Sequence, residues 1–236
     1  SSDATGINSS TAGSGVHVNG AVEIEVAHTG SESKGVYLDN GAQNNLGSGT
    51  SITVENINGT SSLTTVGVSV ENKNNQGTGL VADQLNVTVI NDKHVTGIVN
   101  SGSNSGAIDL GDKSTISVAT TGNGMQVRGV DLSGNSVFKM NEGTITASGP
   151  GFTTGIYTSG TANVQLGDHT KISSISDSSS AHGIYFSSSA GNILDANALE
   201  IKVSGTMASG ISGKGAIDLG EGGKIEIASI GYGAGI

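Results

Sequence analysis

The hexapeptide Gly106–Gly111, GAIDLG, occurs a second time at Gly215–Gly220, 109 residues further along the chain. The segments that follow also match, since GAIDLGDKSTISVA is echoed by GAIDLGEGGKIEIA. Internal repetition of this kind is typical of repeat architectures, in which each unit buries its apolar side against its neighbours. The length of the repeat then decides which architecture the chain adopts.

A glycine followed by an aliphatic residue marks the repeat. The pair opens short segments such as GVYL, GVDL and GIYT, and successive markers are 20 to 32 residues apart with a mean of 27.5. The two GAIDLG copies are therefore four repeats apart. The markers stand at Gly15, Gly35, Gly67, Gly97, Gly129, Gly155, Gly183, Gly210 and Gly235.

Each unit contains three short strand candidates. The first follows the marker glycine, the second is typified by AIDLG, and the third alternates as in TISV or KIEI. Alternation at period two indicates a strand with one buried face. The chain is therefore predicted to be all-β, a right-handed parallel β-helix with three strands per coil and about eight to nine coils, forming a single domain over residues 1–236. A left-handed hexapeptide helix is the alternative, but its six-residue motifs do not tile along this chain.

The pleat of a strand predicts which side chains point into the coil. Leu46, Leu110, Leu166 and Leu219 occupy equivalent inward places, each six residues before an inward isoleucine of the third strand. The glycines suit corners that need a positive φ. The inward set of the third strand is predicted to include Val22, Ile24, Val26, Leu85, Val87, Val89, Ile116, Val118, Leu199, Ile201, Val203, Ile225 and Ile227.

Composition excludes several classes of function. The net charge is −10, which disfavours nucleic acid as a partner. No apolar run approaches the ~18 residues of a membrane-spanning helix, so this segment is not expected to insert into a membrane. The absence of cysteine excludes a disulfide scaffold and thiol chemistry.

With the coils assigned, LGSGTSITV, LGDKSTISV and LGDHTKISS, interleaved with GVYL, GIYT and GIYFS, resemble the passenger domains of Gram-negative type V autotransporters. The resemblance covers nearly the whole chain and is to the adhesin group that includes diffuse-adherence adhesins, self-associating adhesins and pertactin. It implies a role in virulence, cell adhesion or biofilm formation, at the outer-membrane surface or secreted after cleavage. The family's translocator β-barrel and autochaperone segment have no counterpart here, so the chain is expected to be a fragment of a longer stalk.

Parallel β-helices also serve as polysaccharide lyases and hydrolases, which need clustered carboxylates, often with calcium and a nearby basic residue. Asp109 and Asp218 occupy equivalent places four coils apart, ~19 Å by strand spacing, so they cannot form a catalytic pair. A nearer pair, Asp109 with Asp131, stays open because corners bring different strands together. The five histidines lack metal-ligand spacing. We expect no catalytic residue, no metal and no cofactor.

The first strand of each coil offers one outward residue just after the glycine–aliphatic pair. Tyr157 and Tyr185 are expected on neighbouring coils, ~4.8 Å apart in height, beside Asp131. Tyrosine combines an apolar ring with a hydroxyl, which suits recognition of sugars and proteins. The sequence therefore predicts a ligand-binding site at Asp131, Tyr157, Tyr185 and Tyr37, with a purely structural stacking ladder as the alternative. The full outward series is His17, Tyr37, Ser69, Val99, Asp131, Tyr157, Tyr185 and Ser212.

The third strand carries a different outward stripe, in which opposite charges alternate along the axis. We interpret it as register control on a solvated face, because exposed cross-strand pairs contribute only ~0.2–1 kcal/mol each. The two expected stacks are Thr144, Lys171, Glu200 and Lys224, and Thr146, Ser173, Lys202 and Glu226.

Three functions from different classes remain. The expected one is an adhesin that binds a host glycan, a matrix or cell-surface protein, or a copy of itself on a neighbouring cell. The second is a released virulence effector that binds a host receptor and signals. The third is a polysaccharide lyase or hydrolase, although the chain is expected not to be an enzyme.

Overall fold

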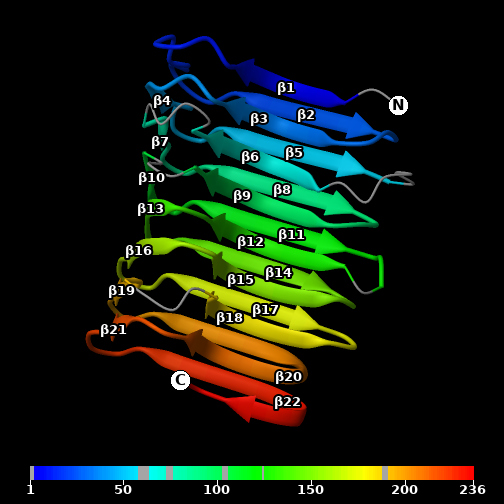
Figure 1. The fold of residues 1–236 in the computed structure, drawn as a ribbon, viewed down its shortest axis with the longest axis vertical. Coiled ribbons are helices and arrows are strands. Elements are labelled where there is room, and N and C mark those ends of the chain that lie inside the picture. The colour runs from blue at the N-terminus through cyan, green and yellow to red at the C-terminus, as the bar shows by residue number, and fades with distance from the viewer. Residues whose placement is uncertain (1–2, 58–63, 73–76, 103–105, 124, 188–190) are drawn as a thin grey trace.

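The computed structural model describes residues 3–57, 64–72, 77–102, 106–123, 125–187 and 191–236. These residues form β-strands on three faces of a coil, with no helix among them (Figure 1). The concave face comprises β1 (Ala4–Ser9), β3 (Ser33–Leu38), β6 (Thr65–Glu71), β9 (Val95–Ser101), β12 (Gln126–Leu132), β15 (Phe152–Thr158), β18 (Ser180–Phe186) and the ends of β20 (Glu200–Gly213) and β22 (Lys224–Ala234).

The other two faces complete each turn. The charged face comprises β2 (Glu23–His28), β5 (Ser51–Asn56), β8 (Asn86–Asn91), β11 (Thr115–Thr120), β14 (Thr144–Gly149), β17 (Lys171–Ser176), and the starts of β20 and β22 (Lys224–Ala234). The short face comprises β4 (Gln43–Asn45), β7 (Gly79–Val81), β10 (Ala107–Asp112), β13 (Asn135–Asn141), β16 (Thr161–Leu166), β19 (Ile193–Ala196) and β21 (Ala216–Asp218).

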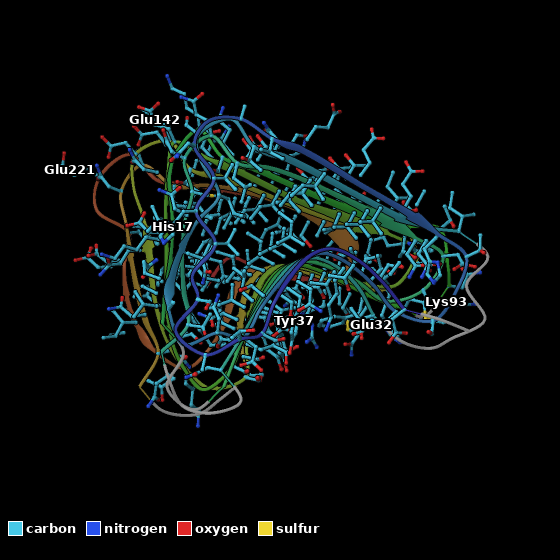
Figure 2. The ribbon with its side chains drawn as sticks, turned by 90° about the horizontal axis from the view of Figure 1, so that it is seen from above. His17, Glu32, Tyr37, Lys93, Glu142 and Glu221 are labelled. Atoms are coloured by element: carbon cyan, nitrogen blue, oxygen red, sulfur yellow. The ribbon has the colours of Figure 1, made fainter. Side chains whose placement is uncertain are left out.

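Each strand pairs in parallel with its equivalent one turn later, as Ile52 does with Val87 and Val87 with Ile116. Viewed from the N-terminal end, the chain runs clockwise around the coil as it recedes, so the β-helix is right-handed (Figures 1 and 2). The seven strands of the short face define about seven turns. The fold prediction is therefore confirmed, with slightly fewer turns than the eight to nine expected because the markers also counted incomplete turns at the two ends.

Aliphatic side chains fill the interior, as the alternation predicted. Leu46, Leu110 and Leu166 are buried in equivalent places, and Leu219 is partly buried in the last turn, where a neighbouring turn lies on one side only. The prediction for Val22 is wrong, because this residue precedes β2 and is 38% exposed in the first turn. The other inward residues predicted for the third strand lie in or against the same core.

The marker glycines lie inside the concave-face strands and not at corners. Gly155 and the next residue, Ile156, are both buried in β15, so two consecutive residues face the interior. A Cβ at Gly155 would stand 2.2 Å from Ile172 Cγ2 and 2.6 Å from the carbonyl oxygen of Gly183. The expectation of positive φ holds for turn glycines such as Gly111, but it is wrong for the markers. From Gly35 to Gly210, the markers must be glycine because the concave face approaches the charged face too closely for a Cβ.

This close approach bends the concave face. Figure 2 shows its strands curving toward the interior at their middle, so the outer side of the face is concave, and a pocket lies on it between β3 and β12. Outward residues near the bend are sheltered in consequence, since Ser69, Thr96 and Thr154 are only 2%, 4% and 0% exposed. We call this concave outer side the groove, and its floor consists of residues that the alternation places on the outside.

Candidate binding groove

One outward residue of each concave-face strand lies on a line along the axis, which we call the tyrosine rank. The register pairs Tyr37 with Ser69, Asp131 with Tyr157, and Tyr157 with Tyr185. Tyr157 and Tyr185 therefore occupy consecutive turns, as predicted. The predicted series is confirmed from β3 to β20 as Tyr37, Ser69, Val99, Asp131, Tyr157, Tyr185 and Ser212.

The first member of the predicted series is wrong. Asn8 of β1 pairs with Tyr37, whereas His17 forms a bridge with Asn45 on the short face. The true first marker is Gly6 with its following isoleucine, 29 residues before the next marker. The irregular 20-residue interval at the start of the series came from a glycine–valine pair that lies on another part of the coil.

A second line of outward side chains runs beside the tyrosine rank, and the sequence reasoning missed it. We call it the pre-glycine rank, because each member immediately precedes a marker glycine. That position is the sequence signal that would have revealed it. Its members are Lys34, Val66, Thr96, Arg128, Thr154, His182 and Ser209.

Four rings gather where the two ranks cross β15 and β18, and we call them the aromatic cluster. The rings of His182 and Tyr185 stack with centroids 4.9 Å apart, and Tyr157 lies 5.7 Å from Tyr185. Phe152, at the start of β15, is 5.1 Å from His182. Aromatic pairs contribute ~0.5–1.5 kcal/mol beyond their burial, so the cluster both stabilises this face and presents apolar surface to the groove.

Arg128 connects the aromatic cluster to Asp131. Its guanidinium carbon lies 3.7 Å from the centroid of the Tyr157 ring, and its terminal nitrogens make a close ion pair with Asp131 and donate to the Gln126 side-chain oxygen at 2.9 Å. Arg128 Nε is buried and has no hydrogen-bond partner among the described residues. The carboxylate that the sequence placed beside the two tyrosines is therefore neutralised by an arginine that the sequence reasoning did not place there.

Tyr37 lies apart from the other three predicted site residues. Three turns, ~14 Å, separate β3 from β12. The Tyr37 ring faces Lys34 Nζ at 4.5 Å, and its hydroxyl is 3.3 Å from a Glu71 carboxylate oxygen. Lys34 also pairs with Glu71 at 3.4 Å and with Glu32 at 3.5 Å, and Figure 2 labels Tyr37 and Glu32 on this face. The predicted site is thus two clusters at different heights of one groove.

His182 is the groove residue whose protonation is perturbed. Burial lowers the pKa of its imidazole below the ordinary value, and the ring is packed against both Phe152 and Tyr185. Its Nδ1 is 3.0 Å from the hydroxyl oxygen of Ser212 on the next turn. The neutral imidazole is favoured in this stack, because the charged imidazolium would be partly removed from water.

The free energy of unfolding is expected to fall as the pH drops through and below about 6.5. The unfolded chain binds a proton at His182 in that range, whereas the lowered pKa makes the folded chain bind it only at lower pH, so acid favours unfolding. Urea unfolding at about pH 7.5 and about pH 5 measures the loss. His182→Gln, which does not titrate, should lose less stability between these conditions than the parent. Equal losses would show that His182 does not contribute.

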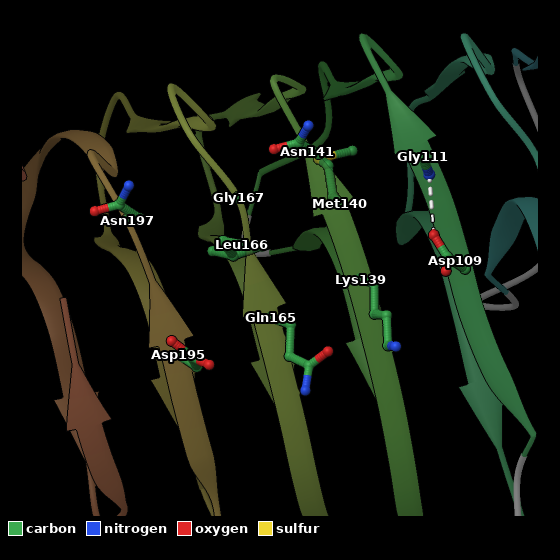
Figure 3. Close-up of a pocket in the computed structure, with 10 residues that line it drawn as sticks. All are labelled: Asp109, Gly111, Lys139, Met140, Asn141, Gln165, Leu166, Gly167, Asp195 and Asn197. Atoms are coloured by element: carbon green, nitrogen blue, oxygen red, sulfur yellow. Dashed lines mark hydrogen bonds between the residues drawn. The ribbon is translucent and has the colours of Figure 1, made fainter. Parts of the chain in front are cut away.

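A hollow of about 440 Å³ lies on the short face over β10, β13, β16 and β19 (Figure 3). The strand pairing that begins at Asp109 of β10 continues in register to Asp218 of β21, four turns away. The predicted separation of these two carboxylates is therefore confirmed. Asp131 belongs to the concave face, a different sheet, and it lines a different pocket from Asp109. The side chains that cross the hollow in one row are Asp109, Lys139, Gln165 and Asp195.

The charged face carries the two predicted stacks in the predicted register. Lys171 Nζ is 3.4 Å from Glu200 on the next turn, and Lys224 makes a close ion pair with Glu226 on its own strand. These side chains are about half exposed or more, so each pair contributes little to stability. Their regular alternation matches a role in keeping the turns in register.

Within the described residues, no group of three or more histidine, aspartate or glutamate side chains is placed to hold a metal ion. The same part of the chain has no helix of the length and apolarity needed to span a bilayer. Comparison with protein-family models, with curated proteins and with solved structures found no match to this chain. The case for the groove therefore depends on its own geometry.

Proposed function

We propose that this protein is an adhesin, a rigid binding rod that presents its concave face to a partner. The aromatic cluster carries the proposal. It places rings from two neighbouring turns, each partly exposed, beside the Arg128–Asp131 pair in a groove. Tyrosine and arginine are the residues that most often anchor protein interfaces, and the tyrosine ring also suits a sugar face.

The resemblance to autotransporter passengers supports a setting for this function. We propose display at the surface of a Gram-negative bacterium, or release from it after cleavage. The partner in this proposal is a host glycan, a matrix or cell-surface protein, or a second copy on a neighbouring cell. A groove that runs along the axis suits a ligand that is extended in the same direction.

Replacing both Tyr157 and Tyr185 by serine is expected to leave the fold intact and to reduce adherence at least tenfold. Serine already occupies the same rank at Ser69 and Ser212, so the backbone accepts it. Loss of two aromatic anchors should cost ~1.4 kcal/mol of binding or more, which corresponds to the tenfold change. Adherence is measured by counting host cells bound by bacteria that display the rod, together with settling of a shaken culture.

Tyr232→Ser is the matched control, because Tyr232 is 72% exposed and lies on β22, two turns beyond β18 of the aromatic cluster. It should adhere and settle like the parent. If the double variant folds and adheres like the parent, the aromatic cluster only stabilises the fold by stacking and does not bind the partner. If the rod is found only in the culture medium and triggers signalling through a host receptor, the released effector is favoured. If incubation with polysaccharides gives unsaturated or reducing-sugar products, the lyase or hydrolase is favoured.

A further inference from the structure

A pocket of about 210 Å³ lies in the groove between its two charged ends, over β6 and β9. The turns on either side carry Lys34 and Arg128, whose longer side chains close the pocket at both ends. The volume corresponds to about seven water molecules at ~30 Å³ each, which is room for one six-membered sugar ring. On these two turns both ranks carry small side chains, which form the floor: Val66, Ser69, Thr96 and Val99.

The charges that line the two ends are already paired with each other. Lys34 Nζ lies 3.4 Å from Glu71 and 3.5 Å from Glu32, and Arg128 pairs closely with Asp131. The side chain of Glu32 is 32% exposed, and the other four are between 15% and 19% exposed. The Glu71 carboxylate already accepts from Lys34, Ser69 and Tyr37. The Arg128–Asp131 pair keeps hydrogen-bonding capacity, because a carboxylate has about four acceptor sites and a guanidinium has five donors. One of those donors, Arg128 Nε, is buried without a partner among the described residues.

We propose that this pocket binds one neutral, polyhydroxylated sugar ring. The inference rests on the proposed function and names its ligand class at one place in the groove. Sugar hydroxyls donate to the carboxylate of Asp131 and accept from Arg128, so both ion pairs stay intact. Val66 and Val99 provide apolar contact for the C–H groups of the ring.

A charged ligand fits this pocket less well than a neutral one. An anion that takes Arg128 leaves the partly buried carboxylate of Asp131 unpaired, and a cation that takes Asp131 leaves Arg128 unpaired. The net charge of −10 on the chain also repels anions. Hydroxyl groups avoid both costs because each of them both donates and accepts.

The test is calorimetric titration of the purified chain with methyl glycosides of glucose, galactose and mannose, and with glucuronic acid and glucosamine as charged counterparts. At least one neutral glycoside is expected to bind with a Kd of roughly 1 mM or tighter. The charged sugars are expected to bind at least ~10-fold more weakly. Binding by no neutral glycoside, or equal binding by a charged sugar, overturns the proposal.

Variants in the tyrosine rank locate the binding. Val99→Tyr fills the pocket with a side chain that the same rank already holds at Tyr37, Tyr157 and Tyr185, and should weaken binding at least ~10-fold. Asn8→Tyr adds the same side chain to the same rank outside the pocket and should bind like the parent. Ser69→Tyr fills the pocket from the neighbouring turn. It replaces Val99→Tyr as the pocket-filling variant if that protein does not fold. A folded pocket-filling variant that binds like the parent overturns the proposal.

Selectivity gives an independent check. Asp131→Asn leaves Arg128 without its ion-pair partner, so glucuronic acid should gain affinity relative to the neutral glycoside. An unchanged ratio of the two affinities contradicts the pocket chemistry.

Cell adherence separates this proposal from the adhesin function. If no sugar binds but the Tyr157 and Tyr185 substitutions abolish adherence, the pocket proposal fails and the adhesin stands. If the sugar binds but no groove variant alters adherence, the adhesin fails and the pocket stands.

Discussion

Gly155→Ala is expected to destabilise the protein by ~3 kcal/mol or more, an effect at the upper end of what overpacking produces. The added Cβ would stand 2.2 Å from Ile172 Cγ2 and 2.6 Å from the backbone oxygen of Gly183. The second contact is with main chain that is held in the next turn, so a change of side-chain rotamer cannot relieve it. Urea unfolding followed by circular dichroism measures the loss.

Gly235→Ala is the matched control for this substitution. Gly235 is the marker glycine of the last turn, and a Cβ there meets nothing within 4 Å. Its unfolding midpoint should therefore stay close to that of the parent. A Gly155→Ala protein as stable as the Gly235→Ala protein would mean that the two faces do not approach as closely as the fold requires.

Ile201→Asp is expected to be the most damaging substitution in the core, with a loss of at least ~4 kcal/mol or failure to fold. Ile201 is 2% exposed and lies directly beneath Gly183, where its Cγ2 fills the space that a Cβ would occupy. Aspartate removes the apolar contacts and places a carboxylate where no described side chain can pair with it. Soluble yield and the thermal melt are the measurements.

The outward face of the same sheet supplies the control for the core substitution. Ile175 on β17 points outward and is 36% exposed, so Ile175→Asp should cost less than ~1 kcal/mol. If the Ile201 and Ile175 variants melt alike, the inward and outward assignment of this sheet is wrong.

The sequence predicted most of the scaffold because the scaffold is repetitive. The spacing from Leu110 to Ile116 recurs in other coils, and the alternation of the third strand leaves one way to bury its aliphatic side. The rank that contains Tyr157 and Tyr185 followed from the same alternation. Once a position is assigned as outward on one coil, the repeat assigns the equivalent position on every other coil. The structure confirms these placements in register.

The chemistry of the groove was not accessible from the sequence. The pairing of Arg128 with Asp131 and its contact with Tyr157 depend on how far the concave face bends, which is a tertiary effect with no sequence period. The role of the marker glycines was misassigned for the same reason, because only the distance to Ile172 shows that space decides the residue and not φ. His17 was misplaced because a glycine–valine pair in a loop imitates the marker.

The ranks of the groove have a consequence for how such a surface changes over generations. Each turn offers the same two outward slots on an unchanged backbone, and the slots of one rank already hold residues as different as asparagine, tyrosine, valine and aspartate. Substitutions can exchange the occupants of these slots while the inward ladder stays fixed. Gain or loss of one whole turn changes the distance between two members of a rank by a single step of ~4.8 Å. Sequence change on the outer side of the rod is therefore largely independent of the packing that holds its shape.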